Sequence, residues 1–320
     1  MQAHAQVLVA PGTFELREVH VPVPAPGELR MRVRACGICG SDKVLAYTSA
    51  PGTVLGHEVI AEVESCGPGV TGWRRGDRAI PVGDRIGMGN GRLGGFAEWL
   101  VVAADACVPV PDTLTSRIAV LAEPMANGLH FVRRARLEAG QDVAIFGAGQ
   151  IGLFTLYWAR HLGARRIAVV EPVPARARFA EQLGADAVID PTITPDVAGA
   201  VTAALGARPR FVFEVTGRGD VMRQAIPLVA TGGGVVVIAG ITLDEISIRP
   251  ASLILKETDL IFPLGAVREE VEETIVALAS GVFPAERFIT HRIRQAEIPA
   301  ALEELGRPTE QIKVVVDYLD

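Results

Sequence analysis

The stretch VAIFGAGQIG, residues 143–152, constrains the fold of this chain more than any other. An apolar strand runs directly into three glycines, and a helical pattern follows them at once. A strand, a glycine turn and a helix in this order form the first unit of a doubly wound parallel sheet that binds a dinucleotide. The first glycine permits the tight turn, the second lets a pyrophosphate approach the backbone, and the third lets helix and strand pack closely. The expected dinucleotide-binding residues are Gly147, Ala148, Gly149, Gln150, Ile151 and Gly152.

An acidic residue at the end of the next apolar strand bears on the choice of cofactor. Glu171 ends the run RIAVVE, where a carboxylate can accept hydrogen bonds from the adenosine ribose hydroxyls. Its charge would repel a ribose phosphate, so the sequence favours NAD over NADP. Arg176 is a further candidate for cofactor binding, and together with Arg178 it keeps NADP open. A glycine turn that serves packing alone is the remaining interpretation.

The pattern of apolar residues divides the chain into two main parts. Residues 1 to about 110 consist of short apolar runs between glycine and proline turns, which is typical of a β-rich domain. From about 116 to 265, short β-branched runs alternate with helical patterns, which indicates a parallel sheet flanked by helices. The tail from 266 could rejoin the first domain. The helices that the pattern predicts most clearly are at 150–162, 175–183, 268–279 and about 298–305.

Composition excludes several classes of protein. A net charge of −6 and the lack of a basic stripe argue against a nucleic-acid-binding protein. No apolar run is long enough to span a membrane, and the N-terminus has no secretory signal pattern. Four cysteines in 320 residues are too few for a disulfide framework. These features predict a cytoplasmic protein that binds neither nucleic acid nor membrane.

Two cysteines in CGICGSD raise the question of a metal site. Cys36 and Cys39 could form a redox pair, half of a zinc knuckle, or two buried side chains of no chemical consequence. A catalytic zinc needs three protein ligands of mixed type and one open position. Cys39, His57 and a downstream acid would supply them. Glu58 follows His57 directly, and Glu123 lies in AEPMA, near the point where the β-rich part gives way to the alternating part.

Several motifs occur in one order along nearly the whole chain: GICGSD, VLGHEVIAEV, GDRAIPV, GGFAEWLVV, AEPMA, FGAGQIG, FEVTG and ITHR. In these the chain resembles the zinc-dependent branch of the medium-chain dehydrogenase/reductase family, and its polyol and threonine dehydrogenase-like members in particular. The resemblance implies an α/β protein in two domains. A β-rich, GroES-like catalytic domain with zinc would comprise residues 1–115 and 266–320. An NAD-binding Rossmann domain would comprise residues 116–265.

The resemblance also assigns roles in the catalytic site. It implies that Cys39 and His57 bind the catalytic zinc, with Glu123 as an acidic third ligand and Glu58 as a neighbour that can reach the metal. Asp42 would orient His57, and the Ser41 hydroxyl would contact the substrate oxygen and receive its proton. The chain departs from the family in two places. Residues 79–93 replace a four-cysteine lobe with a short stretch free of cysteine, so one zinc per chain is expected. Val44 stands where a proton-relay histidine often occurs.

The activity implied is an oxidoreductase that transfers a hydride between a secondary alcohol and NAD. Polyols, sugars, aminocyclitols and amino alcohols are the substrate classes associated with an acid at position 123. Arg292 in ITHR is a weaker candidate for contact with substrate hydroxyls. Two other functions stay open, namely a zinc-free NADPH-dependent quinone or enoyl reductase of the same superfamily and a non-catalytic nucleotide-binding protein. The family also implies a homo-oligomer, a dimer or tetramer, for which DLIFPLGAV (259–267) suits an edge contact.

Overall fold

The computed structural model describes residues 1–82, 86–89, 91–305, 307 and 309–318. The chain forms two compact units. The first contains Met1–Glu123, Val267–Arg307 and the C-terminal segment from Lys313; the second contains Pro124–Ala266 and a short segment that ends at Ile312. Among the described residues, no helix has the length and apolar character required to cross a membrane. The short stretch 79–93 lies partly outside the described residues.

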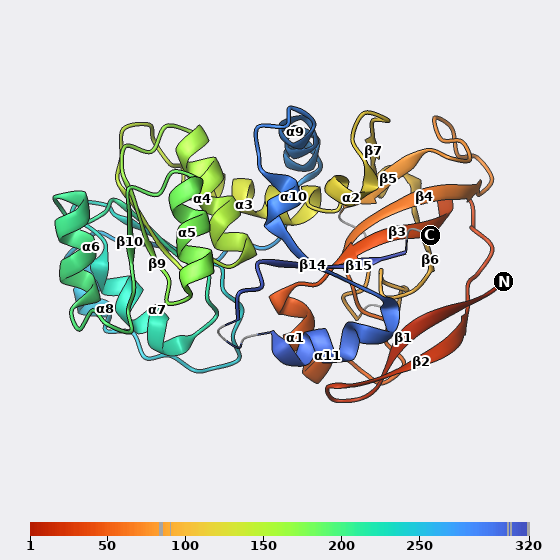
Figure 1. The fold of residues 1–320 in the computed structure, drawn as a ribbon, viewed down its shortest axis with the longest axis horizontal. Helices are drawn as coiled ribbons and strands as arrows, with labels where there is room; N and C mark the ends of the chain where they lie inside the picture. Colours follow the sequence, from red (N-terminus) through yellow and green to blue (C-terminus); the bar gives the residue numbers. More distant parts are fainter. Residues whose placement is uncertain (83–85, 90, 306, 308, 319–320) are drawn as a thin grey trace. The chain divides into compact units, whose positions relative to one another are not determined.

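The first unit is built on a mixed sheet to which both ends of the unit contribute (Figure 1). In the described part of the chain its strand order is β14-β15-β3-β4-β5-β7, with β6 paired to β3. The C-terminal strand β15 thus lies antiparallel to β3, so the end of the chain belongs to the sheet of the first unit. The strands of this sheet are β3 (Glu28–Gly37), β4 (Glu58–Cys66), β5 (Arg78–Pro81), β6 (Trp99–Ala103), β7 (Cys107–Val110), β14 (Ile289–Ile293) and β15 (Lys313–Asp317).

A separate hairpin and a few short helices complete the first unit. β1 (Gln2–Ala10) pairs antiparallel with β2 (Thr13–His20) and contributes Ala5, Val7 and Leu8 to the buried core. The helix α1 begins directly after β3, inside the part of the chain that the sequence pattern indicates as β-rich. The helical elements of this unit are α1 (Gly40–Thr48), η1 (Ala104–Ala106), α2 (Ser116–Ala119), α9 (Arg268–Ala279), α10 (Ala285–Phe288), η3 (Gln295–Glu297) and α11 (Ile298–Glu304).

The second unit is a parallel sheet of the doubly wound type, as the sequence predicts. Its strand order in the described residues is β10-β9-β8-β11-β12-β13, and all neighbours run parallel. The order therefore reverses between β8 and β11, and right-handed crossovers in the two directions place helices on both faces. The strands are β8 (Val143–Phe146), β9 (Ile167–Val170), β10 (Ala187–Ile189), β11 (Phe211–Glu214), β12 (Val235–Ile238) and β13 (Asp259–Ile261).

The core of this unit consists of buried strands, most of whose residues are β-branched, and of the apolar faces of amphipathic helices. The four residues of each of β8, β9, β11 and β12 are all buried, as expected for strands covered on both faces. Residues from α6 and α7 join one buried cluster with these strands. α3 begins at the last residues of the first unit. The helices are α3 (Ala122–Arg134), α4 (Gln150–His161), α5 (Pro174–Gln182), α6 (Val197–Leu205), α7 (Gly219–Ala225), η2 (Ile226–Leu228) and α8 (Pro250–Ile254).

The glycine turn between β8 and α4 has the geometry that the fingerprint predicts. Gly147 has a φ of 101°, which favours glycine. A Cβ at Gly152 would overlap the carbonyl oxygen of Gly147, so helix and turn can touch only because position 152 lacks a side chain. A Cβ at Gly149 would meet nothing within 4 Å. The third glycine thus serves packing, whereas the second leaves open space.

This contrast predicts opposite outcomes for two alanine substitutions. Gly152→Ala should lower the free energy of unfolding by about 1–3 kcal/mol, because the new methyl group overlaps backbone. Gly149→Ala should change it by less than about 0.5 kcal/mol, since the methyl group enters open space at an allowed backbone conformation. Denaturant unfolding of the three proteins measures both values. Equal losses for the two variants would contradict the packing role of Gly152.

Candidate functional site

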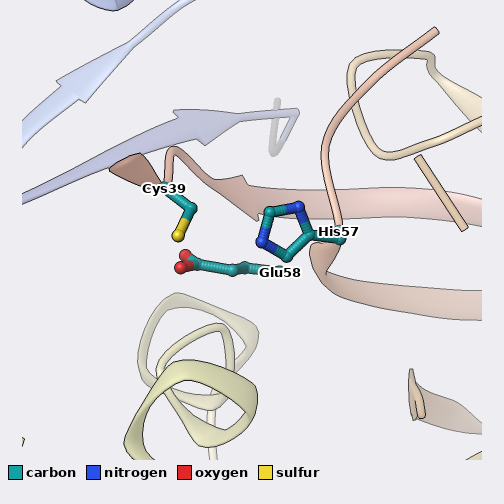
Figure 2. Close-up of side chains that lie close together, drawn as sticks. All are labelled: Cys39, His57 and Glu58. Carbon is teal, nitrogen blue, oxygen red and sulfur yellow. The ribbon is translucent and has the colours of Figure 1, made fainter. Parts of the chain in front are cut away.

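Three side chains that are candidate metal ligands converge in the first unit. The Cys39 sulfur, a His57 ring nitrogen and a Glu58 carboxylate oxygen all lie within 4.8 Å of one another. Figure 2 shows the three side chains turned toward a common point. Glu58 is buried, whereas Cys39 and His57 are partly accessible. The group therefore combines a thiol, an imidazole and a carboxylate at a place that solutes can reach from one side.

The local fold brings these residues together through the ends of two paired strands. Gly37, the last residue of β3, is the register partner of Glu58, the first residue of β4. Cys39 follows two positions later as the N-cap of α1. His57 precedes β4 directly. A side chain at Gly37 would overlap the Glu58 carboxylate, so the close approach of the two strands depends on glycine here.

His57 is held on both sides of its ring. Its Nδ1 lies 3.2 Å from Oδ1 of Asp42, whose side chain is fully buried. Its Nε2 lies 3.3 Å from the Ser41 hydroxyl. The other Asp42 oxygen accepts a hydrogen bond of 2.9 Å from the backbone N–H of Cys39, which fixes the start of α1. Asp42 therefore orients the imidazole and the cysteine loop at once, while Nε2 and Ser41 face the same space.

The protonation states of Cys39 and His57 depend on each other. Burial raises the pKa of the Cys39 thiol, but the hydrogen bond and charge of His57 outweigh this effect and lower its pKa. Burial lowers the pKa of His57, and Asp42 and Cys39 overcome this effect, so that its pKa lies well above the usual value. The surroundings thus favour a thiolate with positive charge beside it. A divalent cation can take the place of the proton under such conditions.

Lys313 is part of this neighbourhood, although its position in the sequence gives no indication of it. It begins β15, is 1% exposed, and forms a buried ion pair with Glu58. Its Nζ also donates to the carbonyl oxygen of Ile38 at 3.1 Å. Burial lowers the pKa of Lys313 to about 8, although the negative groups around it act in the opposite direction. The final strand reads KVVVD, so Lys313 is a charged residue directly before an apolar run, which by itself does not indicate its partner.

The structure places Glu123 and Cys36 in the same region as Cys39. Glu123 lies in the first turn of α3, outside the group of three converging ligands. Burial raises the pKa of the Cys36 thiol well above its usual value, and the charges of Asp42 and Glu123 add to this effect. Glu123 is therefore close enough to Cys36 to interact electrostatically. Cys36 itself is fully buried. Its sulfur packs against Gly95, where an added Cβ would lie only 2.6 Å from it.

Arg292 in β14 has protein partners of its own. Its Nη1 lies 3.5 Å from Oδ2 of Asp317, and its Nη2 donates to the carbonyl oxygen of Arg117 at 3.4 Å. These contacts engage its guanidinium within the first unit. A role for Arg292 in substrate binding stays a prediction.

In the second unit, Glu171 contacts the glycine turn directly. Its Oε2 accepts a hydrogen bond of 2.7 Å from the N–H of Ala148, and its Oε1 accepts one of 2.8 Å from the N–H of Val173. Glu171 is only 3% exposed. The Arg176 side chain donates to the carbonyl oxygen of Gln311 at 2.9 Å. Burial lowers the pKa of Arg176, and the nearby charge of Glu171 only partly opposes this effect. Glu171 thus has a structural task in the turn besides its expected contact with a ribose.

The residues of each site fit the group that the sequence suggests. A thiolate, an imidazole and a carboxylate at this separation form a donor set suited to zinc. The turn at Gly149 offers the open space that a pyrophosphate needs, at the N-terminus of the twelve-residue helix α4. The metal donors lie in the first unit and the dinucleotide turn lies in the second.

Two family descriptions match the chain. Residues 25–112 match the alcohol dehydrogenase GroES-like domain, and residues 151–280 match the zinc-binding dehydrogenase family. The first match covers the cysteine motif and His57 with Glu58. The second begins at Ile151, in the first turn of α4.

Several relatives are similar to the chain over nearly their whole length. The chain is 30% identical to (R,R)-butanediol dehydrogenase of Bacillus subtilis over 95% of this chain and 96% of that protein. It is 27% identical to sorbitol dehydrogenase of Bombyx mori over 98% of both. A crystal structure of a zinc-binding dehydrogenase from Sinorhizobium meliloti, bound to NADP, superimposes with a TM-score of 0.89 at 29% identity, covering 99% of both chains. The chain therefore belongs to the zinc-type medium-chain alcohol dehydrogenase family and is a nicotinamide-dependent oxidoreductase.

Proposed function

We propose that this protein is a zinc-dependent dehydrogenase that transfers a hydride between a secondary alcohol and NAD, with one catalytic zinc per chain. The convergence of Cys39, His57 and Glu58 within 4.8 Å of one another is the observation that carries the proposal. Glu123 is a fourth candidate ligand, on the basis of its position in the motif AEPMA and its charge near Cys36. One zinc is proposed because the chain has no further cysteine cluster.

The side chains around the site have separate roles in an alcohol oxidation. When bound, zinc would polarise the substrate hydroxyl as a Lewis acid and the nicotinamide would accept the hydride. Asp42 holds the His57 ring so that Nε2 stays directed at the site. Oγ of Ser41, 3.3 Å from Nε2, is in position to take the hydroxyl proton and pass it on. Val44 has no group that could continue the relay, so we propose that the proton leaves through water and a cofactor hydroxyl, with Lys43 or Tyr47 as alternative groups.

The relatives indicate the class of substrate. Butanediol and sorbitol, after which two relatives are named, carry vicinal hydroxyl groups. We therefore propose a vicinal diol, polyol, sugar, aminocyclitol or amino alcohol that is oxidised at a secondary carbon. A zinc-free quinone or enoyl reductase is the competing function. It would have no use for a thiolate, an imidazole and a carboxylate that meet at one point.

Metal analysis combined with a substrate panel tests this function. Purified protein should contain about one zinc per chain and should reduce NAD with at least one secondary diol or polyol. Incubation with a strong chelator should remove the activity, and added zinc should restore it. Full activity after complete removal of metal would refute the proposal and would favour the zinc-free reductase.

Substitutions should distinguish the metal ligands from the neighbouring residues that do not bind metal. Cys39→Ala and His57→Ala should each lose bound zinc and lower kcat by about a thousandfold or more, because the charge stabilisation is lost. Glu123→Ala should lower zinc content and rate if it is a ligand. Cys36→Ala is the matched control from the same motif, and it should keep its zinc. Unchanged zinc content and rate in Glu123→Ala would remove Glu123 from the ligand set.

Glu171 is the reason to propose NAD as the cofactor. Its carboxylate lies at the carboxyl end of β9, in contact with the N–H of Ala148, where the negative charge would repel a ribose phosphate. The Sinorhizobium relative, which was crystallised with NADP, favours the other cofactor. Arg176 lies near enough to Glu171 for their charges to interact and could accommodate a phosphate.

The preference can be measured directly. The parent should show a higher kcat/KM with NAD than with NADP, and Glu171→Gln should shrink that ratio by about tenfold, because one repulsive charge is lost. Asp190→Asn is the control, since this partly exposed acid follows the neighbouring strand β10 and accepts a hydrogen bond from Thr192. A parent that prefers NADP would overturn the assignment of the cofactor.

We further propose that the chain forms a homo-oligomer through the edge of the second unit's sheet. Among the described residues β13 is the last strand at one end of that sheet, and the segment after it exposes Phe262 (64%) and Leu264 (73%). An open edge next to exposed apolar side chains is a typical pairing surface. The cytoplasmic location expected from the sequence stays a prediction.

A charge at this edge should disrupt the assembly. Phe262→Lys should shift the molar mass in light scattering from an oligomer to a monomer, because a lysine directly after an edge strand opposes pairing there. Val276→Lys, at an equally exposed apolar position on α9, is the control and should leave the mass unchanged. A parent that is monomeric at all concentrations would contradict the proposal.

A further inference from the structure

A buried acid with no assigned role lies at the centre of the second unit's sheet. Glu214 ends β11 and is 0% exposed. β11 pairs with β8, and Glu214 is the register partner of Phe146, the residue directly before the glycine turn. The strand order reverses between these two strands. Ligands of doubly wound sheets bind beyond the carboxyl ends of the strands at this point of reversal.

The Glu214 carboxylate organises the turn that follows β11. Its Oε1 accepts a hydrogen bond of 2.8 Å from the N–H of Thr216 and a second one from the Thr216 hydroxyl. The hydroxyl oxygen of Thr216 in turn accepts a hydrogen bond of 3.1 Å from the N–H of Arg218. The side chain of one acid thus fixes the backbone and the rotamer of Thr216.

Thr216 and its neighbour pack against the glycine turn. A Cβ at Gly147 would lie 2.8 Å from Cγ2 of Thr216, and one at Gly152 would lie 3.2 Å from Cγ2 of Val215. The N–H of Val215 donates to the carbonyl oxygen of Phe146 at 3.1 Å. The segment that Glu214 organises is therefore in direct contact with the first and third glycines of the fingerprint.

The loop after β12 meets Glu214 from the other side. The Glu214 carbonyl oxygen accepts hydrogen bonds from the N–H groups of Ala239 and Gly240, at 2.9 and 3.1 Å. A Cβ at Gly240 would overlap the backbone of Gly217 and would lie 2.9 Å from Oε2 of Glu214. Glu214 therefore contacts the loops after β11 and β12 directly, and it reaches the loop after β8 through Thr216.

A carboxyl group in this position is expensive to bury. Burial raises the pKa of Glu214, and the hydrogen bonds from Thr216 and Gly217 only partly oppose this effect. Its Oε2 has no hydrogen-bond partner among the described residues. An apolar side chain would fill the same volume without that cost. What an apolar side chain could not do is hold Thr216 through two hydrogen bonds.

We propose that Glu214 is a positioning residue for the dinucleotide cofactor. It holds Thr216 against Gly147 and thereby keeps the glycine turn in the shape that the pyrophosphate requires. The inference rests on the proposed function only in that the chain binds a nicotinamide dinucleotide. Because Glu214 acts on the turn and not on the adenosine ribose, it should affect NADH and NADPH alike.

Cofactor titration of three variants tests this role. Glu214→Ala and Thr216→Val should each raise the Kd for NADH, followed by nicotinamide fluorescence, about tenfold, and the Kd for NADPH by the same factor. Glu214→Gln keeps an acceptor for Thr216 and should stay within about threefold of the parent. Zinc content should stay at the parent level in all three variants, and so should the KM for the alcohol at saturating cofactor.

A buried acid at the opposite edge of the same sheet provides the matched control. Asp142 precedes β8, is 5% exposed, and accepts a hydrogen bond from Arg165 at 2.9 Å. Asp142→Asn should lower stability but leave the Kd for NADH unchanged in protein that is folded at the assay temperature. An unchanged Kd in both Glu214→Ala and Thr216→Val would overturn the proposal. If Glu214→Ala does not fold, Thr216→Val decides alone.

The same titration distinguishes failure of the proposed function from failure of the positioning role of Glu214. A parent protein that binds neither NADH nor NADPH would refute the proposed function. A parent that binds one of them while the Glu214 and Thr216 variants bind it equally well would refute the positioning role alone.

Discussion

The buried ion pair between Glu58 and Lys313 sets the geometry of the candidate metal site. The two residues begin β4 and β15, and β3 lies between these strands and ends at Gly37. Neither charge can remain unpaired at 1% exposure, since breaking such a pair costs about 3–5 kcal/mol. The pair therefore fixes the ends of three strands relative to one another. Cys39 follows one of these ends and His57 precedes another, so their meeting is a consequence of the pairing.

Buried acids outnumber buried lysines at this site. Cys39 has a lowered pKa, and Asp42 and Glu58 are buried acids in contact with His57 or Lys313. One lysine and one imidazole face these three acidic groups. Desolvated negative charge of this density is stabilised when a proton or a metal ion compensates it. The raised pKa of His57 and the suitability of the donor set for zinc therefore have the same physical cause.

Local patterns in the sequence predict those parts of the structure that depend on neighbours in the chain. The dinucleotide turn is predictable because strand, glycines and helix follow each other within ten residues, and the predicted helix 268–279 matches α9. Lys313 is not predictable in this way, since its partner lies 255 residues earlier and only the folded sheet brings them together. The sequence pattern does not predict the helix α1 within the β-rich part, because this helix is short and weakly amphipathic. The ion pair between Arg292 and Asp317 is likewise not visible in the motif ITHR, because it joins two different strands of the sheet.

Each unit uses buried acids to hold the loops that form its site. In the first unit Asp42 holds both the N–H of Cys39 and the ring of His57. In the second unit Glu171 holds the N–H of Ala148, and Glu214 holds Thr216 on the other side of the same turn. A carboxylate that accepts hydrogen bonds from two separate groups ties them more firmly than an apolar contact can, because it fixes direction as well as distance. The family fold supplies the scaffold, and these acids fix the loops on which its chemistry depends.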